Sequence, residues 1–196
     1  MKLPAHIVRQ WITENAHVLD LGCGDGTLLK QLKTERNVSG YGVEIAPERI
    51  TACIRNGVNV IEKNLDTDLH SFADNSFDTV IMTETLQAVH YPDKMIDETL
   101  RIGKEGIVTF PNFGFWKARY GLLFGGKMPV SKELPHSWYD TPNIHFCTVL
   151  DFEQLCKDKG IRILASHYMD NQGKSSWLAR TLPNAFALTA TYRITR

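Results

Sequence analysis

Apolar and polar residues follow two different periods along the chain as far as Asn112. Nearly continuous apolar runs predict buried strands, and apolar residues three and four positions apart predict amphipathic helices. Strands are expected over His17–Gly22, Ser39–Ile45, Val58–Asn64, Phe77–Leu86 and Gly106–Asn112. Helices are expected around Ile7–Ile12, over Thr27–Lys33, from Pro47 to Gly57 and over Lys94–Ile102. This alternation predicts a parallel sheet with right-handed crossovers.

The alternation stops after the fifth expected strand. Residues 113–146 show neither period but contain eight aromatic side chains, so we expect a structured insert. A helix follows, with Thr148 and Asp151 as a capping box. Two final strands, expected to pair antiparallel across a long polar loop, are Arg162–Asp170 and Ala185–Thr195. The prediction is one α/β domain, residues 1–196, with a mostly parallel seven-stranded sheet, an antiparallel final strand and helices on both faces.

Composition narrows the class of protein. The 22 basic residues balance 22 acidic ones, so no overall field favours nucleic acid or an anionic membrane. No apolar run approaches the ~20 residues of a membrane helix, and the first residues do not resemble a signal peptide. The four cysteines are far apart and form no CxxC pair, so no metal site is expected. We therefore expect a reduced, cytoplasmic protein.

Three alternating glycines, Gly22, Gly24 and Gly26, follow the first expected strand. Glycines at a strand-to-helix turn let the backbone approach a ligand. The dinucleotide fingerprint requires Gly or Ala where this chain has Thr27. With Asp20 inside the strand, the spacing instead resembles the first motif of class I S-adenosylmethionine (SAM) dependent methyltransferases. The resemblance implies a Rossmann-like fold, a loop that surrounds the methionine part of SAM, and an amino group bound by Asp20.

Polar residues at the next strand ends extend this resemblance. Glu44 is placed to accept from two ribose hydroxyls, with a solvated strand-end glutamate as the alternative. Asp66 is implied as an adenine contact, although loop acids are often only solvated. Thr83, Glu84 and Leu86 would flank the methyl group or form an ordinary turn. The implied site for SAM or S-adenosylhomocysteine consists of Asp20, Gly22, Cys23, Gly24, Gly26, Glu44, Ile45, Asn64, Leu65, Asp66 and Thr83.

Longer stretches resemble one particular family. The segments HVLDLGCGDGTLL, GVEIAPERI and LPHSWYDTPNIHF are similar to the methionine biosynthesis MetW family, and the likeness extends over nearly the whole chain. The last segment, inside the aromatic insert, is the most specific, because general methyltransferases lack it. The family is associated with homoserine O-acyltransferase, so the resemblance implies that enzyme as a partner. It implies no methyl acceptor.

Catalysis and regulation remain two hypotheses. Methyl transfer from a sulfonium depends mainly on alignment and exclusion of water. For a catalyst, His136, Tyr139 and His145 are candidates to orient or deprotonate an acceptor, with structural hydrogen bonds as the alternative. A SAM-binding regulator of the acyltransferase is the competing hypothesis, and the one we favour. The aromatic insert is interpreted as a lid, a docking surface or core packing.

Overall fold

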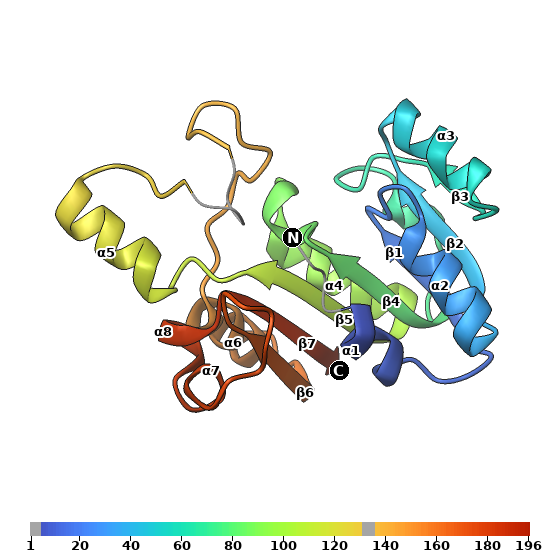
Figure 1. The fold of residues 1–196 in the computed structure, drawn as a ribbon. Coiled ribbons are helices and arrows are strands. Elements are labelled where there is room, and N and C mark those ends of the chain that lie inside the picture. Colours follow the sequence, from blue (N-terminus) through green and yellow to red (C-terminus); the bar gives the residue numbers. More distant parts are fainter. Residues whose placement is uncertain (1–4, 131–135) are drawn as a thin grey trace.

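The computed structural model describes residues 5–130 and 136–196 and joins seven strands in one sheet. The strands are β1 (His17–Leu21), β2 (Ser39–Glu44), β3 (Val60–Glu62), β4 (Phe77–Thr83), β5 (Gly103–Pro111), β6 (Arg162–Met169) and β7 (Thr189–Thr195). Their order is β3-β2-β1-β4-β5-β7-β6 (Figure 1). The pairs from β3 to β5 are parallel, whereas β7 runs antiparallel to both β5 and β6. The predicted mostly parallel sheet with an antiparallel last strand is confirmed.

Helices cover both faces of this sheet. They are α1 (Ala5–Trp11), α2 (Thr27–Arg36), α3 (Pro47–Arg55), α4 (Pro92–Ile102), α5 (Trp116–Gly125), α6 (Val149–Asp158), α7 (Trp177–Thr181) and α8 (Pro183–Phe186), with short 3-10 turns η1 (Leu69–Ser71) and η2 (Leu86–Ala88). Ile81 belongs to a core cluster with α1, α2 and α3, whereas its neighbours Val80 and Met82 belong to a cluster with α4 and α6. Adjacent strand residues point to opposite faces, so the two clusters lie on opposite sides of the sheet.

Several boundaries differ from the sequence-based prediction. The third strand is shorter than expected, and the fourth ends at Thr83, where η2 follows after a short turn. The fifth begins earlier, at Gly103. The last strand was predicted to begin at Ala185 but begins at Thr189, and the expected polar loop before it contains α7 and α8. Pro183 occupies the first turn of α8, where its fixed φ favours a helix despite the strand-like apolar run that follows.

The segment 113–146 contains a helix, α5, that the sequence pattern did not predict. Two cations, Lys117 and Arg119, and two glycines interrupt its apolar residues, so its sequence shows no clear helical period. Residues 131–135 of this segment, with Lys132, and residues 1–4 lie outside the described residues. The predicted capping box of α6 is present: Thr148 accepts from the backbone N–H of Asp151, whose side chain accepts from the N–H of Thr148. None of the helices within 5–130 and 136–196 is long and apolar enough to cross a membrane.

Candidate functional site

The glycine loop lies between β1 and α2, at the edge where the parallel strands end. The backbone N–H groups of Gly22 and Cys23 both donate to the carbonyl of Val43, at 2.9 and 3.0 Å, which ties the loop to β2. Gly22 has a left-handed φ of 76°, and a Cβ there would lie 2.5 Å from Oγ1 of Thr85. Only glycine therefore lets the loop pack against the segment after β4.

Asp20 is the most unusual residue of the site. Its side chain lies in β1 and is 1% exposed. Among the described residues, neither carboxylate oxygen has a hydrogen-bond partner. Burial, together with the negative charge of Glu44, raises the pKa of Asp20 to about 7. An unpartnered buried carboxylate is costly, so this position favours a ligand that brings a cation or N–H donors.

Glu44 ends β2 and is 5% exposed, so it is not a solvated strand-end glutamate. Its Oε1 accepts from the N–H groups of Ile45 and Ala46, at 2.9 and 3.1 Å. Its Oε2 accepts from the N–H of Gly24 at 3.0 Å and lies 3.7 Å from Nη1 of Arg49. The carboxylate is thus fixed against the glycine loop, and Oε2 has a lone pair left for a ligand hydroxyl.

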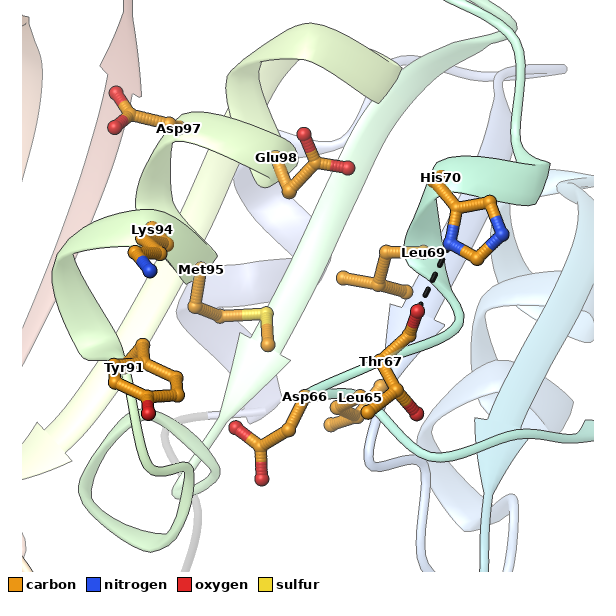
Figure 2. Close-up of a pocket in the computed structure, with 10 residues that line it drawn as sticks. All are labelled: Leu65, Asp66, Thr67, Leu69, His70, Tyr91, Lys94, Met95, Asp97 and Glu98. Atoms are coloured by element: carbon orange, nitrogen blue, oxygen red, sulfur yellow. Dashed lines mark hydrogen bonds between the residues drawn. The ribbon is translucent and has the colours of Figure 1, made fainter.

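Asp66 is held by a contact that the sequence did not predict. Its two oxygens accept from the backbone N–H of His90, at 2.9 Å, and pair with the His90 ring at 2.8 Å. With Leu65, it lines a cavity of about 360 Å³ between η1 and α4, shown in Figure 2. The lining of this cavity includes neither Asp20 nor Glu44. The adenine role of Asn64, Leu65 and Asp66 therefore stays a prediction.

The turn after β4 holds two further buried acceptors. Glu84, directly after Thr83, has a left-handed φ of 56°, which is strained for a residue with a Cβ. Burial raises the pKa of its carboxyl group. Within the described part of the chain, Oε1 of Glu84 and Oε1 of Gln87 have no hydrogen-bond partner. The sequence left Glu84 as either a residue beside the methyl group or an ordinary turn residue, and it did not indicate Gln87, because backbone strain and unpartnered atoms leave no sequence pattern.

The side chains of the three candidate catalytic residues do not contact one another in a common cluster. His136 is exposed, and Tyr139 is 74% exposed with its ring edge against Trp138. His145 lies on η2: its backbone N–H donates to the carbonyl of Gln87 at 3.0 Å. Across residues 5–130 and 136–196, no hydrogen bond joins these three side chains to one another. Their catalytic role stays a prediction.

Cys23 packs inside the loop. Its Sγ lies 3.7 Å from Sγ of Cys53, and burial raises the pKa of the Cys23 thiol far above its usual value. A thiol held protonated is a poor nucleophile, so Cys23 has a packing role. In the described ranges, no group of three or more His, Cys, Asp or Glu side chains is arranged to hold a metal ion.

A family model for the methionine biosynthesis protein MetW matches residues 4–194. The chain belongs to the MetW family. A curated relative, the bifunctional methionine biosynthesis protein MetXA/MetW of Rhodopirellula baltica, is 36% identical over 153 residues, or 74% of this chain. The match covers 25% of that relative, so the chain spans about a quarter of its length.

Solved structures share the fold at low identity. A SAM-dependent methyltransferase of Thermotoga maritima has a TM-score of 0.68 at 17% identity, covering 97% of this chain and 86% of its own. A methyltransferase of Mesorhizobium loti has a TM-score of 0.70 at 12% identity, covering 98% and 96%. The [4+2]-cyclase SpnF has a TM-score of 0.69 at 15% identity, covering 98% and 80%. The MetW-family chain therefore has a class I methyltransferase fold, which other chemistries also use.

Proposed function

We propose that this MetW-family chain binds SAM or S-adenosylhomocysteine at the carboxyl ends of β1 and β2, and that it acts with or regulates homoserine O-acyltransferase. The binding proposal rests on the buried, unpartnered carboxylate of Asp20. Both cofactor forms carry an ammonium group, and SAM adds a sulfonium. Such a ligand supplies the charge and the donors that Asp20 lacks.

In this proposal, the other predicted residues contact different parts of the ligand. Gly24 leaves open space beside the backbone, whereas Gly22 lets the loop pack against Thr85. Glu44 offers Oε2 to the ribose hydroxyls from a position fixed by three backbone N–H groups. Asp66 is assigned to adenine, and Thr83 lies at the end of β4 beside the loop. Bound SAM supplies a methyl group on a good leaving group, and the chain binds it, orients it and excludes water.

The partnership rests on the family. The chain is a MetW-family protein, and the Rhodopirellula relative joins MetXA and MetW in one bifunctional chain. Two functions joined in one chain in a relative are held at a high effective concentration there. We infer that this chain meets the acyltransferase through a surface contact.

A second candidate function is methyl transfer to an unidentified small molecule. The observation that favours it is the pair of buried acceptors after β4, Oε1 of Glu84 and Oε1 of Gln87. An acceptor that carries N–H or O–H donors would satisfy them. Formation of S-adenosylhomocysteine at a rate that depends on an added substrate supports this candidate, and a chain that binds SAM without turnover supports the regulatory one.

Calorimetric titration tests the cofactor site. SAM and S-adenosylhomocysteine are titrated into the wild type, Asp20→Asn and Glu44→Gln. Glu14→Gln is the matched control, because Glu14 is an exposed acid before the amino end of β1. We expect saturable binding to the wild type and control, and binding about 10- to 100-fold weaker to each site variant. Absence of heat from the wild type would contradict the proposal.

A second experiment tests the partnership. The chain is mixed with the acyltransferase of the same organism, and the mixture is analysed by size-exclusion chromatography and by acyl-transfer rate, with and without SAM. We expect co-elution and a changed rate. Separate elution together with an unchanged rate would exclude the acyltransferase role and leave the cofactor site untouched.

A further inference from the structure

Helix α5 exposes a row of large apolar side chains. Trp116, Tyr120, Leu123 and Phe124 are 45%, 59%, 76% and 70% exposed, and only Ala118 is buried among the ten residues of the helix. Their spacing, i, i+4, i+7 and i+8, puts them on one side of the helix, here called the α5 face. Figure 1 shows α5 standing out from the body of the molecule, at the end opposite α2 and α3.

Such a surface is unusual for a free helix. A ten-residue helix is marginal in water without tertiary packing, and contiguous exposed apolar patches mark sites of interaction. Trp and Tyr are also the side chains that contribute most often to the centres of protein interfaces. The exposure of the α5 face excludes core packing within this chain.

The base of α5 is firmly attached, so the face is held in place. Phe115, before the first residue of the helix, is 5% exposed. The guanidinium of Arg119 donates to the carbonyls of Gly114 and Asn184. Asn112 is buried, and its side chain accepts from Gly114 N–H at 2.9 Å and donates to the Ala187 carbonyl at 2.7 Å. A rigid face loses little entropy when a partner covers it.

The charges around α5 indicate what kind of surface covers it. The segment 113–127 contains Lys117, Arg119 and Lys127 and no acidic residue, although the whole chain is neutral. A two-fold contact of α5 with a second copy would bring these cations together without acids to pair them. A different protein with an apolar groove and an acidic rim fits better.

We propose that the α5 face is the docking surface for homoserine O-acyltransferase. This inference rests on the proposed function, which names that partner from the family and from the fused relative. The apolar side chains enter a groove on the enzyme, and Lys117 and Lys127 pair with acidic residues at its rim.

The test measures binding of the purified acyltransferase by calorimetry. The variants are Leu123→Asp with Phe124→Asp, and Lys117→Glu with Lys127→Glu. Ile54→Asp is the matched control, since Ile54 is 66% exposed but lies on α3. We expect the apolar double variant to bind about 100-fold more weakly or not at all, the charge variant to bind about 10-fold more weakly with a reduced salt dependence, and the control to bind like the wild type. Unchanged SAM binding in every variant verifies the fold.

Each other outcome overturns the proposal in a distinct way. Wild-type binding that survives Leu123→Asp with Phe124→Asp would place the interface elsewhere and leave the partnership standing. Failure of the wild type to bind would remove the partnership itself. A wild-type dimer that the same variant converts to monomer without affecting the enzyme would identify a second copy as the occupant. Sedimentation with anionic vesicles, lost in this variant, would identify a membrane surface if the enzyme still binds.

Discussion

The glycine-loop site and the α5 face reverse the usual distribution of side chains in opposite ways. At the first, Asp20 is a buried carboxylate that has no hydrogen-bond partner among the described residues. At the second, Leu123 and Phe124 are large apolar side chains that water surrounds. Water normally hydrates charges and excludes apolar surface, so each region costs free energy in the isolated chain. We propose a different kind of partner to offset each cost: the ammonium group of a ligand for Asp20 and a protein surface for α5.

The supports of the two regions differ as well. The glycine loop is held by neighbouring strands, through the Val43 carbonyl and the Glu44 carboxylate. Helix α5 is held only at its base, by Phe115, by Arg119 and above all by buried Asn112, which links the end of β5 to α6 and α8. The comparison teaches that the candidate ligand site is supported by several strands, whereas the α5 face is supported at one end of one helix.

Removing the Asn112 side chain should cause the largest loss in the free energy of unfolding. Asn112→Ala deletes hydrogen bonds to Gly114, Val149, Pro183, Asn184 and Ala187 in a buried site. We expect about 4 kcal/mol loss in the free energy of unfolding, because several buried backbone groups lose their partner. Urea unfolding measures it. Asn184→Ala, at a partly exposed position nearby, is the control, and an equal loss in both would contradict a special role for Asn112.

The pH dependence of stability tests the polar region. The pKa of Asp20 rises from 3.8 when unfolded to about 7 when folded. Folding therefore retains a proton, and the stability that Asp20 contributes is lost as pH rises through 7. Between pH 4 and pH 8 the wild type should lose up to about 4 kcal/mol relative to Asp20→Asn. Thermal unfolding of the ligand-free proteins measures this difference.

Saturating SAM should remove much of that pH dependence, because its cation favours the ionised carboxylate. Binding near pH 6 should also release a proton, which titrations in buffers of different ionisation enthalpy detect. Parallel stability profiles of the wild type and Asp20→Asn would contradict the burial argument.

Alanine substitutions at two glycines of the loop distinguish the steric cost of an added Cβ from the cost of a left-handed backbone conformation. In Gly22→Ala the new Cβ meets Thr85 in a left-handed residue, so we expect a loss of about 3 kcal/mol. Gly24 also has a positive φ but no neighbour within 4 Å of a Cβ, so Gly24→Ala should cost about 1 kcal/mol. Adding Thr85→Ala to Gly22→Ala should recover part of the difference. Equal urea midpoints for the two single variants would refute the contact.

The smallest change in the free energy of unfolding is expected for a substitution on the α5 face. Leu123→Ser should change the free energy of unfolding by less than about 0.5 kcal/mol, because Leu123 is 76% exposed. Phe115→Ser, in the same segment but 5% exposed, should cost about 3 kcal/mol. Chemical denaturation compares them, and a large loss in Leu123→Ser would mean that α5 packs against its own chain.

The sequence named residues of the polar site but not the helix of the insert. Asp20 was named from the glycine-loop motif and Glu44 from the end of the second strand, and the structure brings both to the carboxyl edge of adjacent parallel strands. The pairing of Asp66 with His90, 24 residues away, was missed because no local rule links two loops. Helix α5 was missed because cations and glycines interrupt its apolar residues, which obscures the amphipathic period. The left-handed conformation of Glu84 has no signature at a residue other than glycine.

By itself, the sequence determined the alternation of strands and helices as far as Asn112, the glycine loop and the family. These depend on periodicity, on glycine at turns and on spacing, which are local properties of the chain. Only the tertiary structure decided which atoms lack partners and which apolar side chains stay in water. Asp20 lacks a hydrogen-bond partner because no residue from a distant part of the described chain donates to its carboxylate, and the α5 face stays exposed because none covers it. The number of available partners is a property of the packed molecule, so no local pattern contains it.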